Sequence, residues 1–89
     1  MRNFLSDGAE LRSQIKALVL EFMQTSPECS ADAAGIRQAQ IFKKCGLDWG
    51  EYPKATSNSQ QFWLVGLLGE LEDEDKIQRD TSTKRWRVK

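Results

Sequence analysis

The clearest periodic pattern in the chain lies between residues 56 and 75. Its apolar positions recur at the i, i+3, i+4, i+7 spacing, which places them on one stripe of a helix. The stripe consists of four leucines, Leu64, Leu67, Leu68 and Leu71. Thr56 precedes a polar first turn, and its hydroxyl can accept a hydrogen bond from a free backbone N–H there. The pattern predicts a helix over about 57–74 that buries its leucines.

The period of the pattern changes from 3.6 to 2 after this helix. Ile77 opens an alternating run, and a second alternating run follows the turn residues 80–83. In the second run Lys84, Trp86 and Val88 share one face, and Arg85, Arg87 and Lys89 share the other. Two alternating runs around a polar turn predict a β-hairpin over about 76–89, with Trp86 and Val88 packed inward.

Another helical pattern lies near the start of the chain. Its apolar face consists of Leu11, Ile15, Leu18, Val19, Phe22 and Met23. Asp7 and Glu10 form a capping box, so this helix is expected to begin at Gly8 or Ala9. It should end near Thr25, because Pro27 disfavours the helical conformation of the residue before it. Residues 1–6 are expected to form a loose tail, unless Phe4 and Leu5 fold back onto the first turn.

The middle of the chain predicts a short helix between two connecting segments. From Gln38 onwards Ile41, Phe42 and Cys45 share a face, and Gly46 is placed to end the helix. The residues before it, Gly35 to Arg37, suit either a short strand beside the hairpin or the opening turn of the helix. The connector after it, residues 47–55, contains Trp49 and Tyr52. Their rings either cover the small core or remain exposed to stack on a base or a partner.

Three helices followed by a hairpin resemble the winged helix-turn-helix domain. The matching residues are the pattern Leu68-x-x-Leu71-Glu72-Asp73-Glu74-Asp75-Lys76-Ile77 and the strand Arg85-Trp86-Arg87-Val88. The resemblance covers the chain from about residue 8 to its end. It implies a mostly α fold with a small β-sheet, in which three helices precede a C-terminal hairpin wing and a short third strand can be added. Many members have glycine where this chain has Asp75, at a left-handed helix exit that an aspartate tolerates at some cost.

Composition bounds the class of protein. The 89 residues suit a single domain over 1–89, and no apolar run approaches the ~20 residues that cross a bilayer. The N-terminus lacks a secretory pattern, so a cytoplasmic protein is expected. Cys29 and Cys45 are not in a CxxC arrangement, and the chain has no histidine, so we expect reduced thiols and no metal site. No nucleophile elbow or phosphate-binding glycine loop is present, which predicts neither a catalytic residue nor a cofactor.

Charge is balanced in total and uneven along the chain. Thirteen basic residues match thirteen acidic ones. Residues 76–89 nevertheless contain six basic residues and one acidic residue, a net charge of +5, whereas residues 70–75 contain five acidic residues and no basic one. The acidic run is expected to be a solvated helix end. The basic segment is the kind of surface that holds nucleic-acid phosphates, although an edge strand defended by charge would look the same.

The resemblance and the charge pattern together predict binding of double-stranded DNA. The helix over about 57–74 would be the recognition helix, with Asn58, Ser59, Gln61 and Phe62 facing bases. The residues expected at phosphates are Lys54, Ser57, Arg85, Arg87 and Lys89. A simpler reading of Asn58, Ser59 and Gln61 is that they cap and solvate a helix start.

Such domains also occur as accessory parts of regulators and DNA-processing proteins. The alternative is a protein-interaction or dimerisation module that uses Phe62, Val65, Gly66 and Gly69, which point away from the leucine stripe. Under either reading neither a membrane nor a small-molecule substrate is expected as a partner.

Overall fold

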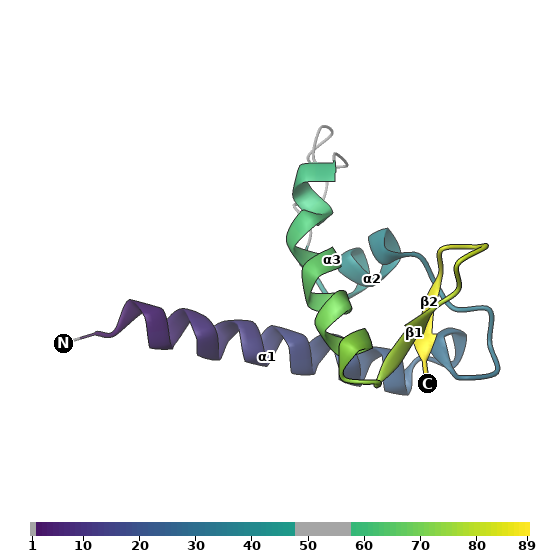
Figure 1. Cartoon of the computed structure of the whole chain (residues 1–89), viewed down its shortest axis with the longest axis horizontal. Helices are drawn as coiled ribbons and strands as arrows, with labels where there is room; N and C mark the ends of the chain where they lie inside the picture. Colours follow the sequence, from purple (N-terminus) through teal and green to yellow (C-terminus); the bar gives the residue numbers. More distant parts are fainter. Residues whose placement is uncertain (1, 48–57) are drawn as a thin grey trace.

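The computed structural model of the chain describes residues 2–47 and 58–89, with side chains outside 58–62. The fold is mostly helical with a small antiparallel sheet of two strands, which confirms the expected fold class. Its elements are α1 (Phe4–Thr25), the 3-10 turn η1 (Pro27–Cys29), α2 (Gln38–Lys44), α3 (Asn58–Asp73), β1 (Ile77–Arg79) and β2 (Trp86–Val88). In Figure 1, the end of α3 crosses the C-terminal half of α1, and the hairpin lies beside the C-terminal part of α1.

The leucine stripe of α3 is the centre of the core. Its four leucines are all buried, as the periodicity predicts. Around them pack buried residues from every other element: Val19, Met23, Cys29, Ile36, Ile41, Phe42, Ile77 and Trp86. Full burial of a leucine contributes about 1.5–3 kcal/mol. The stripe is therefore the largest single apolar contribution to the association of α1, α2 and the hairpin.

The start of α1 lies earlier than the capping box predicts. The helix begins at Phe4, because the Asn3 carboxamide oxygen accepts a hydrogen bond from the backbone N–H of Ser6 at 3.0 Å. Asn3 is therefore the N-cap, and Asp7 lies within the first turns, where it pairs with Arg2 at 2.7 Å. The expected loose tail over residues 1–6 is wrong, since residues 4–6 are helical. The predicted end at Thr25 is confirmed.

The apolar face of α1 is only partly in the core. Val19 and Met23 are buried and Ile15 and Phe22 are half-buried, as expected. Leu11 and Leu18 instead remain 52% and 46% exposed. The cause is geometric, because α3 covers one side of α1 only and the N-terminal turns of α1 extend past it (Figure 1).

The residues before α2 form a single β-bridge. The N–H of Ile36 donates to the carbonyl of Trp86 at 3.0 Å, and the N–H of Trp86 donates back at 2.8 Å. Arg37 is already the N-cap of α2. Of the two alternatives for Gly35 to Arg37, the strand is thus realised as one residue pair beside β2. The stop at Gly46 is confirmed, with φ of 71°.

The exit from α3 follows the expected left-handed route. Asp75 has φ of 66°, and the N–H of Lys76 donates back to the carbonyl of Leu71 at 3.1 Å. The hairpin then pairs in register, Ile77 with Val88 and Arg79 with Trp86. The predicted cap at Thr56 and the aromatic residues Trp49 and Tyr52 lie outside the described residues.

One residue of the predicted hairpin faces is misplaced. Lys84 has φ of 61° and belongs to the loop, not to β2. It therefore does not continue the face of Trp86, which is buried, and Val88, which is half-buried. Alternation applies only to extended backbone, and the extended part is three residues long.

Gly35 should be the least replaceable glycine of those described. Its φ is 85°, and a Cβ built there would lie 2.5 Å from the carbonyl oxygen of Trp86. Gly35→Ala should lower the free energy of unfolding by about 2–4 kcal/mol, from the left-handed conformation and the clash together. Gly66→Ala, where nothing lies within 4 Å, should raise it by about 0.5–1 kcal/mol. Urea unfolding followed by circular dichroism measures both, and equal midpoints for the two variants would refute the assignment.

Candidate functional site

The hairpin gathers the basic residues that were expected to meet phosphates. Arg85, Arg87 and Lys89 lie on or next to β2, within one short ribbon. Arg85 and Arg87 are half-buried and Lys89 is exposed. The structure brings these three together, but it also gives each of them a partner within the chain.

Arg85 is tied to the segment that leads into α2. Its Nη1 donates a hydrogen bond to the carbonyl oxygen of Gly35 at 3.2 Å. Because Gly35 precedes the bridge residue Ile36, this bond supports the attachment of the hairpin to the helices. A guanidinium has five N–H donors, so Arg85 retains donors for an anion after this bond is made.

Arg87 and Lys89 pair with carboxylates at the two ends of the hairpin. Arg87 lies 3.5 Å from Asp80 in the turn, and Lys89 forms an ion pair with Asp75 at the α3 exit. Asp80 also accepts hydrogen bonds from the Ser82 hydroxyl at 2.7 Å and from the backbone N–H groups of Ser82 and Thr83. These donors, the Ser82 hydroxyl first, and then Arg87 hold the pKa of Asp80 well below its usual range.

Two further cations lie on the hairpin, and the sequence pattern did not place them at the site. Arg79 pairs with Trp86 across the strands, so it lies on the Trp86 face and not on the face of Arg87. The Arg79 guanidinium lies 5.5 Å from the centroid of the Trp86 ring, a cation–π distance. Lys84 is exposed in the loop. Within the part of the chain that the structure describes, neither forms an ion pair. The strand register, which sets Arg79 opposite Trp86, was the signal that would have identified Arg79.

The residues expected to face bases belong to the first turns of α3. Asn58, Ser59, Gln61 and Phe62 are helical positions whose side chains are not among those described. Lys54 and Ser57 lie outside the described residues. The structure therefore describes only the hairpin part of the predicted site.

The outward face of α3 is apolar and open farther along the helix. Val65 is 40% exposed and Gly66 is exposed, as predicted, whereas Gly69 is half-buried. Trp63, which the sequence pattern did not single out, is 41% exposed and meets Phe42 edge to face with the ring centroids 5.4 Å apart. Beside it a hollow is lined by Arg12, Gly66, Leu67 and Glu70.

The acidic end of α3 is not simply solvated. Lys16 of α1 forms an ion pair with Glu74 and lies 3.6 Å from Glu70. The hydrogen bond with Glu74 raises the pKa of Lys16, and the same bond lowers the pKa of Glu74. Glu72 and Asp73 are exposed, as expected. Lys16 was missed because its partners lie 54 and 58 residues away along the chain.

Both thiols are enclosed by the core. Cys29 is buried and Cys45 is half-buried, and burial raises the pKa of each, so both favour the protonated form. Across residues 2–47 and 58–89 no cluster of three or more acidic or cysteine side chains is placed to hold a metal ion. In the same ranges no helix has both the length and the apolar character of a bilayer-spanning segment.

No protein-family model, curated protein or solved structure matches this chain. The residues of the chain itself therefore carry the functional proposal.

The Asp80 turn predicts a loss of stability in acid. Since the pKa of Asp80 is lower in the folded state than in the unfolded state, its contribution is complete above about pH 5. It disappears as the pH falls through the unfolded value near ~4 towards the folded value. Asp80→Asn should therefore lose more stability at pH 7 than at pH 3, measured by urea unfolding. Glu72→Gln, on the exposed end of α3, should show no such difference, and an equal effect of both variants would contradict the assignment.

Proposed function

We propose that the chain binds double-stranded DNA, with the hairpin on the phosphates and the first turns of α3 in the major groove. The observation that carries the proposal is the cationic ribbon that directly continues α3. Six basic residues accompany one acidic residue between Lys76 and Lys89. Neutralisation of phosphates by such residues releases counterions, and this release drives most sequence-independent binding to DNA.

The arrangement of the elements supports the resemblance to winged helix-turn-helix domains. The order α1, bridge residue Ile36, α2, α3 and hairpin is the order that the resemblance implies. The left-handed exit at Asp75 and the bridge beside β2 support it further. We infer that α3 is the recognition helix and the hairpin the wing, in a domain of a regulator or a DNA-processing protein.

The internal ion pairs of the hairpin are compatible with this function. Pairs between exposed side chains contribute little net free energy, because water and salt screen them. The Lys89–Asp75 pair is of this exposed kind, whereas Arg87 and Asp80 are both half-buried. A phosphate that approaches the ribbon can replace Asp75 at Lys89 readily and Asp80 at Arg87 at a greater cost. The exposed Lys84 forms no ion pair among the described residues, so it needs no such exchange.

The polar first turns of α3 contain the residues that we propose contact bases. Asn58 and Gln61 are residue types that bond adenine in the major groove, and Phe62 suits a thymine methyl group. Ser59 completes the base-facing set. Ser57 and Lys54 precede the helix and would reach phosphates, as would free backbone N–H groups of its first turn.

A salt-dependent titration tests DNA binding. A fluorescent duplex of roughly 20 base pairs should bind at ~50 mM salt and lose affinity steeply towards ~200 mM. Arg87→Gln with Lys89→Gln should weaken binding at least about tenfold and lower the salt slope by about 2, one for each lost phosphate contact. This pair spares Arg85, which supports the fold.

The matched control removes two positive charges elsewhere. Lys43→Gln with Lys44→Gln changes the net charge equally at the exposed end of α2, and it should leave most of the affinity. Absence of binding at ~50 mM salt, or an equal loss in both double variants, would remove the proposal.

A docking role for α3 is the second candidate, and the exposed Trp63 and Val65 beside the α1–α3 hollow favour it. Here the outward face of α3 would receive another protein domain. Val65→Glu separates the two functions. If α3 enters the major groove, the new carboxylate should weaken DNA binding by at least about tenfold through repulsion by phosphates. Unchanged DNA affinity would show that this face lies away from DNA and would favour the docking role.

A further inference from the structure

The N-terminal half of α1 carries apolar side chains that nothing in the described structure covers. The helix has 22 residues, about 33 Å of length, and its first turns extend beyond the other elements (Figure 1). Phe4 and Leu5 are 76% and 87% exposed. With Leu11 and Leu18 they account for four of the six large apolar side chains that are exposed among the described residues.

Three of these side chains repeat at intervals of seven residues. Phe4, Leu11 and Leu18 have that spacing, and Gly8, Ile15 and Phe22 alternate with them at steps of four and three. This is the repeat that forms the seam between two helices in a left-handed pair. We call the surface formed by these six residues the α1 seam. On a helical wheel its three exposed members Phe4, Leu11 and Leu18 lie about 60–100° away from Val19, which points into the core. Gly8 and Ile15 lie about 20–40° from Val19, at the edge of the seam next to the core.

We propose that the α1 seam binds the same seam of a second copy of this chain, with the two helices parallel. A seven-residue repeat is self-complementary in this arrangement, since each residue of the seam meets its own counterpart across a twofold axis. The inference is independent of DNA binding.

Charges beside the seam select the parallel orientation. One flank carries Asp7, Glu10 and Gln14, and the other carries Arg12. In a parallel pair the two opposite flanks of the helices face each other, so Asp7 of one copy meets Arg12 of the other, five positions along. In an antiparallel pair like flanks would meet, and acidic residues would oppose acidic residues. A surface that binds a different protein needs charges that complement that protein. Flanks that complement each other therefore favour a second copy of this chain.

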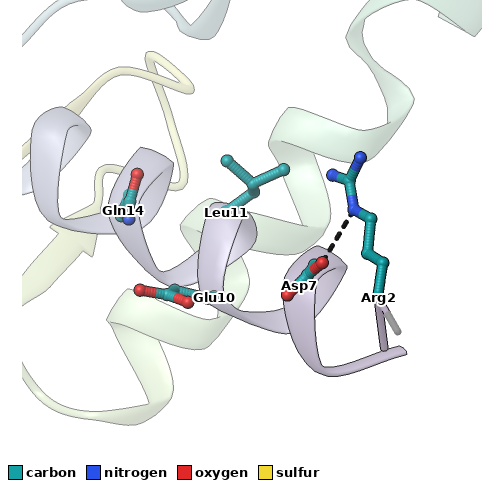
Figure 2. Close-up of a pocket in the computed structure, with 5 residues that line it drawn as sticks. All are labelled: Arg2, Asp7, Glu10, Leu11 and Gln14. Atoms are coloured by element: carbon teal, nitrogen blue, oxygen red, sulfur yellow. Dashed lines mark hydrogen bonds and ion pairs between the residues drawn. The ribbon is translucent and has the colours of Figure 1, made fainter. Parts of the chain in front are cut away.

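The surface in Figure 2 is the acidic flank of the seam. Leu11 stands there between Asp7 and Gln14 along the helix, and Glu10 lies beside it. Asp7 pairs with Arg2 at 2.7 Å, with both side chains largely open to solvent. An exposed pair of this kind is weak enough for Asp7 to exchange Arg2 for Arg12 of a second copy.

The domain core lies mainly on another side of α1 than the exposed members of the seam. A twofold axis parallel to α1 therefore sends the two cores in opposite directions. Ile15 and Phe22 are half-buried against the core and form the edge of the seam next to it. The Lys16 ion pairs with Glu70 and Glu74 lie on the core side, away from the seam.

Sedimentation equilibrium of the whole chain tests the association. Between about 10 µM and 1 mM the mass should rise from monomer to dimer, with a dissociation constant below about 100 µM. Leu11→Glu should weaken this association at least about tenfold by burying a charge in the seam. Leu11 is half exposed, so the fold should persist, which circular dichroism verifies. Gln24→Glu adds the same charge at an exposed site on the opposite side of α1 and should remain a dimer.

Cross-linking tests the orientation. Gly8→Cys places a thiol in the seam, where nothing lies within 4 Å of the new Cβ. Oxidised glutathione should convert this variant to a covalent dimer, releasing two reduced glutathiones for each disulfide formed. Glu10→Cys, on the outer side of α1, should link far more slowly, and the unsubstituted chain reports any reaction of Cys29 and Cys45. A monomeric mass at ~1 mM, an unchanged mass for Leu11→Glu, or equal linking of both cysteine variants would overturn the proposal.

Discussion

The attachment of the hairpin to the helices depends on two backbone hydrogen bonds between Ile36 and Trp86. They attach the hairpin to the segment that enters α2, so that β2 is bound on both sides. An isolated two-stranded hairpin is marginally stable in water, and the ribbon therefore depends on this attachment and on the burial of Ile77 and Trp86. The close approach of Gly35 to the Trp86 carbonyl is the steric condition for it. The indole N–H of Trp86 finds no acceptor among the described residues, a cost that burial of the large ring offsets.

Local patterns along the chain predicted the elements well. The leucine stripe, the hairpin and the two-turn α2 each depend on residues within one or two turns of each other, whereas the left-handed exit at Asp75 was expected from the resemblance. A local pattern of this kind determines which side chains share a face of the helix or strand. The start of α1 failed for a local reason too, since Asn3 and Asp7 are both good N-caps and the sequence does not rank them.

Tertiary placement was beyond the reach of those patterns. Periodicity cannot show where α3 crosses α1, so it could not tell that Val19 is buried while Leu18 is exposed. Nor could it pair Lys16 with Glu74, or Arg85 with the Gly35 carbonyl, because each pair joins distant parts of the chain. Of the candidate site, the sequence identified the cationic ribbon, but the partners of its cations appear only in three dimensions.

The connection between α3 and β1 has a mechanical consequence. Only Glu74, Asp75 and Lys76 separate the two elements, and their N–H groups are all bonded back to α3, that of Lys76 to Leu71 in the buried stripe. A load applied to the tip of the ribbon therefore cannot be absorbed by a slack connector. The load is transmitted as torque to the last turn of α3. A ligand that binds the tip of the ribbon therefore also sets the rotation of α3 about its own axis.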